Sequence, residues 1–316
     1  RTTGVYMFTD AQGEVLYVGK ASNLRSRVRS YFGTNESRTK VGSLLKLMQG
    51  IEFIQTPDLL TAEVLELRII GRLRPRYNHA GTRTAKYCYV RLTTEEEWPR
   101  LMVSKTPSAK GICIGPISTR NMATEVVDAI ESVIPLRRCT VRMGRKYVAP
   151  DGAPVCSAAR LGLAQCPCSG TAEPESYAIA VQQAANALTG KSTDVIEALT
   201  IRMNAHSEAQ RYEEAAYLRD RIQTFETVLR RQKQAEKLCS QGKFTVSFDN
   251  IVYEVDNGVL ASTRNADQLF MPLASLSKHV HEAIVVPNGV HDEHGMLRSD
   301  AMDEVLCIAK FLEAQQ

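Results

Sequence analysis

The first eighty residues combine short alternating runs with helical repeats. Two runs rich in aromatic and β-branched residues flank the turn residues 10–13, which predicts a β-hairpin. Ser22 and Asn23 can cap a following helix in which apolar residues return every three to four positions. The predicted elements are, in order, strands over residues 3–9 and 14–19, a helix from residue 24, a helix over 41–48, a strand over 51–55 and a helix over 60–72 that Pro75 ends. This ββααβα order predicts a small α+β layer.

The rest of the chain mixes both periodicities, so the fold class expected for the whole is α+β. A connector rich in Gly and Thr at residues 81–84 separates the two parts. Beyond it we expect strands over residues 87–92, 101–104, 244–248, 251–255 and 283–286, and helices over 122–134, 175–188, 194–206, 207–237 and 302–312. The helix over 207–237 is too long for one element unless it breaks near Gln210. Asp256-Asn257-Gly258 is a hairpin turn signal.

Charge divides the chain more clearly than composition does. Hydrophobic residues make up 44% and charged residues 23% of the 316 residues, as in ordinary globular proteins. Residues 1–170 carry 25 Lys and Arg against 14 Asp and Glu, whereas residues 171–316 carry 14 against 21. A basic front and an acidic back indicate that the front faces a polyanion, the alternative being two domains with ordinary surfaces.

Two further features of the sequence concern the location of the protein and the extent of the chain. No apolar run approaches the roughly 20 residues that a membrane span needs, so a membrane protein is excluded and a cytoplasmic one is expected. The chain begins at Arg1 without Met or an apolar signal segment, from which we expect a piece of a longer protein.

The eight cysteines fall into two groups. Four stand alone in apolar or helical surroundings, where a small buried hydrophobic side chain is the usual role: Cys88, Cys113, Cys239 and Cys307. The other four, Cys139, Cys156, Cys166 and Cys168, lie within thirty residues and favour a metal or cluster site over disulfides. Their spacing does not match the paired CxxC of zinc ribbons, which makes zinc the second choice. Free thiols remain a third alternative.

Tyr6 and Tyr17 lie on the two strands of the predicted hairpin, where tyrosines are ordinarily just good strand formers. A tyrosine is a base only where cations favour its phenolate, and Lys20, Arg27 or a metal are candidates for that. Arg27 cannot be the base itself, but its fork suits a phosphate oxygen.

The hairpin resembles the GIY-YIG nuclease family. Gly4-Val5-Tyr6 and Tyr17-Val18-Gly19 form the paired signature, and the run from Tyr17 through Lys20 and Arg27 to Tyr31 looks like the N-terminal domain of UvrC or of its shorter homologue Cho. The family places a Glu twelve residues before the Asn of a Pro-x-Tyr-Asn motif, as Glu66 and Asn78 are placed here.

The resemblance implies cleavage of a phosphodiester, which needs a base, a cation at the phosphate and stabilisation of the leaving oxygen, and it implies roles for these residues. Glu66 would bind one divalent cation, magnesium or manganese, and Asn78 would support the site, whereas Glu63 is expected to be a surface charge. The catalytic set expected is Tyr6, Tyr17, Lys20, Arg27, Tyr31, Glu66 and Asn78. DNA phosphates would be contacted by Arg25, Arg29, Arg74 and Arg76.

The resemblance continues into the middle of the chain. The segment from Lys86 to Cys139 is similar to the UvrC connector, and UvrC-like proteins hold a four-iron four-sulfur cluster with four cysteines here, which assigns Cys139, Cys156, Cys166 and Cys168. The family's third cysteine falls where this chain has Ala164, so Cys166 is displaced. Residues 208–222 resemble the UVR motif through which UvrB and UvrC associate. Their apolar positions, Ala215, Leu218, Ile222 and Phe225, equally suit an ordinary amphipathic helix.

Together these features give five expected segments and one expected function. The segments are a GIY-YIG nuclease domain (1–84), a connector domain (85–138), a cysteine-rich cluster segment (139–170), a helical UVR-like region (171–237) and a small C-terminal α/β region (238–316). We expect a metal-dependent endonuclease of nucleotide excision repair that cuts damaged duplex DNA 3′ of a lesion, with UvrB as a possible partner. The alternatives are a catalytically silent DNA-binding or assembly module with this fold, and a GIY-YIG nuclease outside repair.

Overall fold

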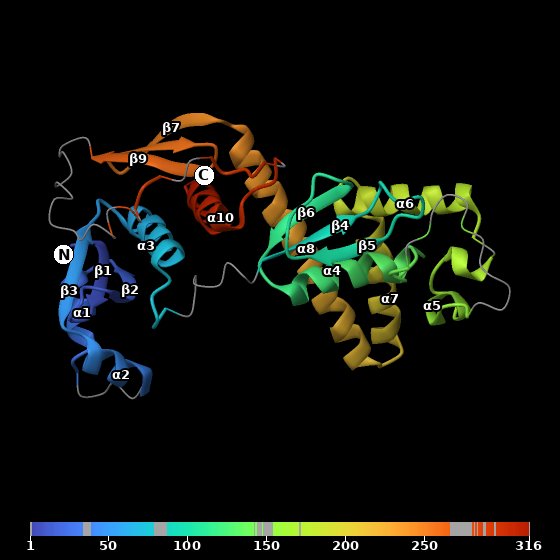
Figure 1. Cartoon of the computed structure of the whole chain (residues 1–316), viewed down its shortest axis with the longest axis horizontal. Coiled ribbons are helices and arrows are strands. Elements are labelled where there is room, and N and C mark those ends of the chain that lie inside the picture. The colour runs from blue at the N-terminus through green and yellow to red at the C-terminus, as the bar shows by residue number, and fades with distance from the viewer. Residues whose placement is uncertain are drawn as a thin grey trace. The chain divides into compact units, whose positions relative to one another are not determined.

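The chain forms two compact units in the computed structural model (Figure 1). The structure describes residues 2–33, 39–78, 87–141, 143, 147, 154–170, 172–265, 280, 282, 284–286, 289–293 and 295–315. One unit comprises Arg1–Thr84, Gln234–Val290 and Arg298–Gln316, and the other comprises Ala85–Lys233 and His291–Leu297. The connector expected at residues 81–84 lies outside the described residues, and the five-part division of the sequence stays a prediction. Among the described residues, no helix combines the length and apolar character of a membrane span.

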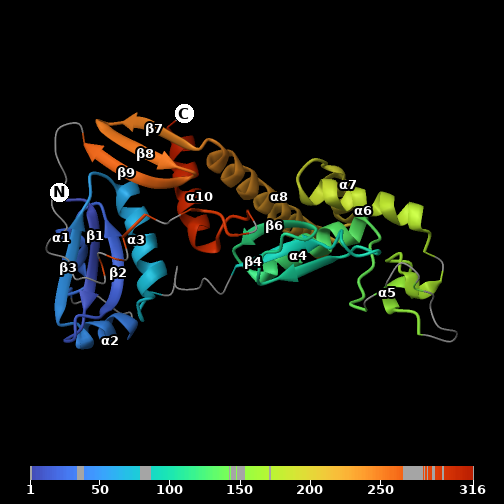
Figure 2. The ribbon, with the colours of Figure 1, turned by 45° about the horizontal axis from the view of Figure 1, so that its top comes forward.

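The first unit opens with the predicted ββααβα order. Its elements are β1 (Gly4–Thr9), β2 (Val15–Ala21), α1 (Leu24–Ser30), α2 (Thr39–Leu47), β3 (Gly50–Gln55) and α3 (Leu59–Leu73). The strands pair antiparallel in the order β2-β1-β3, so β1 is central and β2 and β3 are edges (Figure 2). The predicted cap is confirmed at Asn23, whose side chain accepts a hydrogen bond from the Ser26 amide. Helix α3 ends at Arg74, a left-handed residue with φ 49°, directly before Pro75.

The two faces of this sheet carry different cores because side chains alternate along β1. Val5 and Met7 pack with residues of α3 such as Ala62 and Ile69. Tyr6 and Phe8 point to the opposite face, where their cluster includes Leu24 of α1 and Leu44 of α2. All six residues of β1 are buried. The sheet is therefore covered by α3 on one face and by α1 and α2 on the other, and the tyrosines lie on the α1 face.

The C-terminal part of the same unit is a second antiparallel sheet with one long helix. It consists of β7 (Lys243–Phe248), β8 (Ile251–Asp256) and β9 (Val259–Asn265), paired in that order, and α10 (Ser299–Ala314), which packs on α3. The predicted hairpin turn joins β8 to β9, with φ 49° at Asn257 and 87° at Gly258. The strand predicted over residues 283–286 is wrong for its described residues. Ile284 instead donates its amide to the Val280 carbonyl, as in a helical turn, and both side chains belong to the α3-side core.

The second unit packs helices against one face of a small sheet. Its elements are β4 (Cys88–Leu92), β5 (Leu101–Ser104), β6 (Ile112–Ile117), α4 (Arg120–Val133), α5 (Ser157–Arg160), the 3-10 turn η2 (Pro167–Ser169), α6 (Pro174–Leu188), α7 (Asp194–Glu208) and α8 (Tyr212–Ser240), whose last turns belong to the first unit. Strand β6 was not predicted, because Gly115 and Pro116 are residues that usually end a strand. It is an edge strand in the order β5-β4-β6, where a residue without an amide donor is tolerated.

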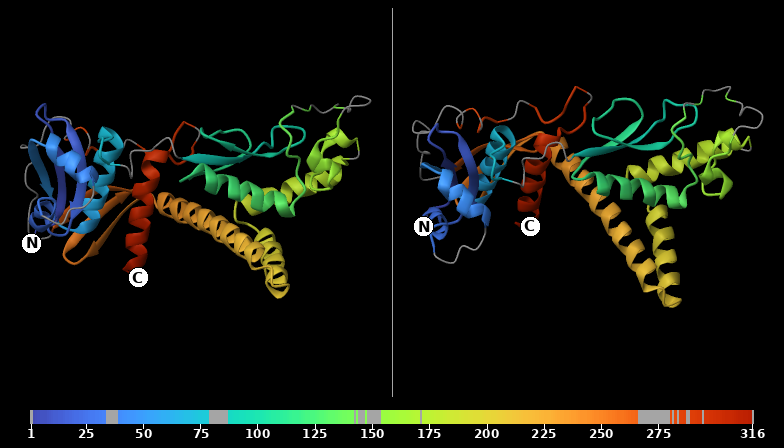
Figure 3. Two further views of the ribbon diagram at one scale, coloured as in Figure 1. Left: turned by 90° about the horizontal axis from the view of Figure 1, so that it is seen from below. Right: turned by 60° about the horizontal axis from the view of Figure 1, so that its bottom comes forward.

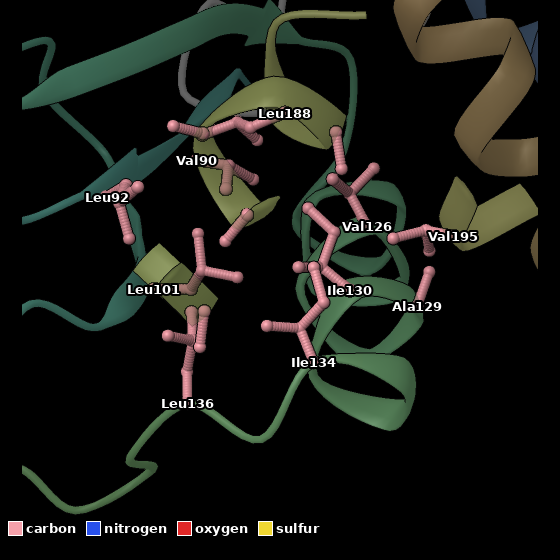
Figure 4. Packing of buried hydrophobic residues seen from close by; sticks show 14 of the residues in the cluster. Val90, Leu92, Leu101, Val126, Ala129, Ile130, Ile134, Leu136, Leu188 and Val195 are labelled. Atoms are coloured by element: carbon pink, nitrogen blue, oxygen red, sulfur yellow. The ribbon is translucent and has the colours of Figure 1, made fainter. Parts of the chain in front are cut away.

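The core of this unit lies between β4, α4 and the following helices. Val90 and Leu92 of β4 face Val126 and Ile130 of α4, and Leu188 of α6 closes the cluster (Figure 4). Helices α7 and α8 then form a hairpin that turns at Gln210, whose φ is 59° (Figure 3). The predicted break near Gln210 is therefore confirmed.

Candidate active site

Three tyrosines converge on the α1 face of the first sheet. The hydroxyls of Tyr6 and Tyr31 are 2.7 Å apart and buried, and the ring of Tyr17 lies 6.1 Å from each of theirs. The exposed side chain of Arg27 donates through Nε to the Tyr6 hydroxyl at 3.4 Å, and its guanidinium lies 5.5 Å from the centre of the Tyr31 ring. The structure thus joins four residues of the expected catalytic set, drawn from β1, β2, α1 and the residue after α1.

Glycines of the signature leave room for this arrangement. Gly19 is paired with Tyr6 across β1 and β2, and a Cβ atom at Gly19 would lie 2.5 Å from the Tyr6 hydroxyl. A Cβ atom at Gly4 would lie 2.0 Å from the Ile54 carbonyl oxygen. Contacts below 3.0 Å force something to move, so each position needs a residue without a side chain. The two glycines therefore have steric reasons for their places.

Burial of the three tyrosines opposes their ionisation. Burial raises the pKa of Tyr6, and it raises the pKa of Tyr17 and of Tyr31 to about 12. Arg27 acts in the opposite direction on all three but is the weaker influence. The exposed guanidinium of Arg27 therefore does not favour a phenolate by itself, because desolvation outweighs it. Which cation would favour the phenolate stays a prediction.

Lys20 and Glu66 meet on the α3 side of β2. The backbone amide of Lys20 donates to Glu66 Oε1 at 3.1 Å, and Lys20 Nζ lies 3.1 Å from Glu66 Oε2. The same ammonium lies 3.1 Å from Glu63 Oε1. Burial lowers the pKa of Lys20, but the charges of Glu66 and Glu63 outweigh it and the net shift is upward. Glu66 is thus held in a fixed place beside a cation, and Glu63 takes part in that cluster.

Asn78 closes the edge of β2. Its Oδ1 accepts from the Val18 amide and its Nδ2 donates to the Val18 carbonyl, both at 2.8 Å. The Tyr77 amide also donates to the Leu16 carbonyl. The buried Asn78 amide therefore pairs with the strand as a further strand residue would. It fixes β2 at Val18, between Tyr17 and Lys20.

The arginines expected to contact phosphates lie at two places. Arg25 and Arg29 are exposed on α1, and Arg74 and Arg76 are exposed after α3. Arg76 also stacks over the Tyr77 ring at 5.9 Å. Their contact with DNA stays a prediction.

In the second unit, the four clustered cysteines converge. Cys139 Sγ and Cys168 Sγ lie 3.4 and 3.1 Å from Cys166 Sγ, and the sulfurs of Cys156, Cys166 and Cys168 lie within 4.8 Å of one another. Burial raises the pKa of Cys166. The geometry includes the displaced Cys166, which was the uncertain member of the set. Three soft sulfur donors within reach of one another, with Cys139 next to Cys166, are a donor set suited to zinc or an iron–sulfur cluster.

A fully buried arginine that was not predicted from the sequence contacts the backbone beside these cysteines. Arg137 donates to the carbonyl oxygens of Cys139 and Val141 at 3.0 and 2.9 Å and to that of Trp98 at 2.5 Å. It also pairs with Glu96 and lies 3.6 Å from Cys139 Sγ. In the sequence Arg137 stands beside Arg138, and only the fold shows that it is interior.

The apolar stripe of the UVR-like helix is used within the chain. Ala215, Ile222 and Phe225 are buried, and Leu218 packs against the same core. Large apolar side chains that remain exposed on this hairpin are Ile201, Tyr212 and Tyr217. Interior packing therefore explains the stripe, and any partner would meet other residues.

The combination of a tyrosine-bearing hairpin, an arginine on α1 and a glutamate on α3 is that of a GIY-YIG endonuclease domain. Comparison with protein families agrees: residues 2–79 match the UvrC-like GIY-YIG domain, residues 87–187 the middle domain of the UvrC/Cho excinuclease, and residues 193–228 the UvrB/uvrC motif. The chain belongs to the UvrC family.

Relatives support this assignment along most of the chain. UvrABC system protein C of Syntrophus aciditrophicus is 35% identical over 234 residues, which are 74% of this chain and 37% of the relative. That of Desulforudis audaxviator is 36% identical over 230 residues, 72% of this chain and 36% of the relative. The chain thus spans a little over a third of the length of these relatives.

A solved structure also matches the first domain. The magnesium-bound GIY-YIG N-terminal endonuclease domain of UvrC from Thermotoga maritima is 35% identical, with 24% of this chain and 83% of that chain covered and a TM-score of 0.23.

Proposed function

We propose that this chain is a metal-dependent endonuclease that incises one strand of damaged DNA 3′ of the lesion in nucleotide excision repair. One observation carries the proposal. Strand β2 presents Tyr17 to the Tyr6–Arg27 cluster, holds Lys20 against Glu66 and is fixed between them by Asn78. A phosphodiesterase needs a proton acceptor, a cation and a phosphate ligand. Tyr17 and Lys20 lie on β2, Glu66 of α3 contacts Lys20, and Arg27 of α1 belongs to the tyrosine cluster.

Glu66 is the residue we assign to the divalent cation. The Thermotoga maritima domain is described as bound to its catalytic divalent cation, magnesium. Here the Glu66 carboxylate is mostly buried and already faces a positive charge, the Lys20 ammonium. Hard carboxylate oxygen suits magnesium or manganese. When bound, the cation would polarise the phosphate and favour the phenolate of a nearby tyrosine.

The remaining roles follow from what each side chain can do. Tyr6 is buried and its hydroxyl already contacts Tyr31 and Arg27, so we assign it to holding that cluster together. Tyr17 is half-buried and is the better candidate to accept a proton from water. Arg27 is exposed and has donors left for a phosphate oxygen. Lys20 positions Glu66 and supplies positive charge at the same edge.

The partners proposed are damaged duplex DNA and UvrB. The curated relatives are components of the UvrABC system, and residues 193–228 match the UvrB/uvrC motif. For UvrB we propose the exposed residues of the α7–α8 hairpin, because Tyr212, Tyr217 and Ile201 place apolar surface in water there. A cytoplasmic location fits an enzyme acting on chromosomal DNA.

For the cysteines we propose a four-iron four-sulfur cluster held by Cys139, Cys156, Cys166 and Cys168. The proximity of the Cys156, Cys166 and Cys168 thiols, with Cys139 next to Cys166, supports a metal site of this kind, with zinc as the second choice. We assign it to stabilising the loop-rich segment, since the cysteines belong to another unit than Glu66.

The function is tested by incubating the full chain with an end-labelled, bubble-containing duplex, with manganese and with chelator. We expect a single incision that requires the metal. Glu66→Gln should abolish incision and leave DNA affinity nearly unchanged, whereas the matched variant Glu63→Gln should retain most activity. Metal-independent cutting, or full activity of Glu66→Gln, would refute the proposal.

A further inference from the structure

A groove opens between α1 and β3, on the same face of the sheet as the tyrosines. It has a volume of about 520 Å³, and Tyr6 is part of its wall. Phe53 of β3 and Phe32, which follows α1, line it and are 54% and 55% exposed. Single exposed apolar side chains are ordinary, but two exposed aromatic side chains that line one groove are typical of a binding surface. The proposed reaction does not use either phenylalanine.

The sheet register places Phe53 beside the catalytic cluster. Tyr6 and Phe53 are direct partners across β1 and β3, and paired residues project from the same face. Tyr6 is buried because α1 and its neighbours cover it, whereas Phe53 stands on the edge strand and is left open. The groove therefore continues from the buried tyrosine to the exposed phenylalanine.

The other wall of the groove is positive. Arg25 and Arg29 line it, and residues four apart on a helix share a face. Among the described residues that line the groove, none is acidic. An apolar lining with two exposed aromatic rings beside two guanidinium groups matches a nucleotide, whose base stacks on aromatic rings while its phosphate pairs with arginine.

We propose that this groove binds one unpaired base of the DNA strand that is cut, stacked against Phe53 and Phe32, with flanking phosphates on Arg25 and Arg29. The inference rests on the proposed function and adds a substrate requirement to it. A base reaches the groove only when it has left the duplex stack, so a distorted or unpaired nucleotide next to the incised phosphate favours binding. An apolar peptide is the competing occupant.

A tryptophan reporter tests the occupant directly. Trp98 is the only tryptophan of the chain, so Phe53→Trp adds one new signal, read as the difference from the unaltered chain. The probes are a twelve-nucleotide thymidine oligomer and an abasic oligomer of the same length. We expect the thymidine oligomer to quench the added fluorescence and the abasic one to leave it. Tyr212→Trp, exposed on α8, is the control and should respond to neither. Equal responses of Phe53→Trp to both oligomers, or none, would overturn the proposal.

Affinity gives the second measurement. Phe53→Ala should weaken binding of the thymidine oligomer by about fivefold to a hundredfold and leave the abasic oligomer unchanged. Phe53→Tyr should restore the affinity because the ring is kept, and a failure to restore it would count against stacking. These readouts need no cleavage. If the unaltered chain incises DNA but the Phe53 variants give no sign of stacking, only this inference is overturned. If they show stacking but the chain does not incise DNA, this inference is supported and the proposed nuclease function is refuted.

Discussion

Arg68 of α3 and Glu304 of α10 form a buried two-pronged ion pair. Arg68 Nε and Nη2 donate to the two carboxylate oxygens of Glu304 at 2.9 and 2.6 Å. Arg68 also donates to the Leu260 carbonyl, and Glu304 accepts from the Leu260 amide. Arg68 is two residues from Glu66, so the C-terminal sheet and helix hold the same helix that carries the proposed metal ligand. Residues 229–316 lie beyond the three matched families.

Glu304→Gln should lower the free energy of unfolding substantially. Removing one partner of a buried pair leaves the other charge uncompensated and costs roughly 3–5 kcal/mol. Urea unfolding of the full chain, followed by circular dichroism, measures the change. The control is Asp300→Asn, which removes the partly exposed partner of Arg298 and should cost at most about 1 kcal/mol. Similar small losses for both variants would show that the pair does not fasten the C-terminal region.

Gly19→Ala should abolish most incision. The added Cβ would lie 2.5 Å from the Tyr6 hydroxyl, so the phenol or β2 must move and the contacts with Tyr31 and Arg27 are disturbed. Initial incision rates at saturating DNA test this. Gly71→Ala is the matched control, because a Cβ there meets nothing within 4 Å, and in a helix it should stabilise by roughly 0.5–1 kcal/mol. A Gly19→Ala enzyme as active as Gly71→Ala would contradict the steric argument.

Asn78→Asp should reduce incision more than DNA affinity. Aspartate keeps the acceptor for the Val18 amide but loses the donor to the Val18 carbonyl, and an unmade buried hydrogen bond costs about 1–3 kcal/mol. The shift of β2 would displace Tyr17 and Lys20 together. Rates and binding constants measured on one duplex separate the two effects. Asn204→Asp, exposed on α7, should change neither.

The order of elements around the site could be predicted from the sequence because its signals are local. Alternation predicted the hairpin, Ser22 and Asn23 predicted the start of α1, and Pro75 predicted the end of the last helix. What could not be predicted depends on distant pairing. Phe53 belongs to the proposed base-binding groove because it lies opposite Tyr6. Arg137 is interior, where it donates to the Trp98 carbonyl and pairs with Glu96.

The same reason explains the errors. Gly115 and Pro116 are typical of the end of a strand, and the sequence pattern does not show that β6 is an edge strand, where they are tolerated. Residues 284–286 have strand composition, yet tertiary packing of Val280 and Ile284 on the α3 side decides their conformation. The pKa values of the tyrosines likewise depend on burial, which residue identity alone does not give.

The salt dependence of DNA binding should decrease when the basic side chains near the site are removed. Each phosphate contact contributes about 0.9 to the slope of log affinity against log salt. Replacing Arg25, Arg29, Arg74 and Arg76 by Gln should therefore lower the slope by about three to four. Titrations at several potassium chloride concentrations measure it. The paired control, Arg211→Gln with Arg230→Gln in the acidic back half, should leave the slope unchanged, and an equal decrease would refute the division of charge.

The cysteine site should reveal its metal by colour and composition. Protein purified without oxygen should be brown, with iron and acid-labile sulfide each near about four per chain, whereas zinc would leave it colourless. Cys139→Ser, Cys156→Ser and Cys168→Ser should each lose the metal and destabilise the segment, because the loop loses a ligand that holds it. Cys113→Ser, a half-buried cysteine on β6, is the control.

Cys166 decides between the expected spacing and the observed geometry. Its sulfur lies 3.4 Å from that of Cys139 and 3.1 Å from that of Cys168, so it is central to the group although its position in the sequence is displaced. Cys166→Ser should therefore lose the metal as completely as Cys139→Ser does. Incision should survive in part, because Tyr17, Arg27 and Glu66 belong to the other unit. Full retention of iron in Cys166→Ser would remove this residue from the ligand set, and unchanged folding in all four variants would favour free thiols.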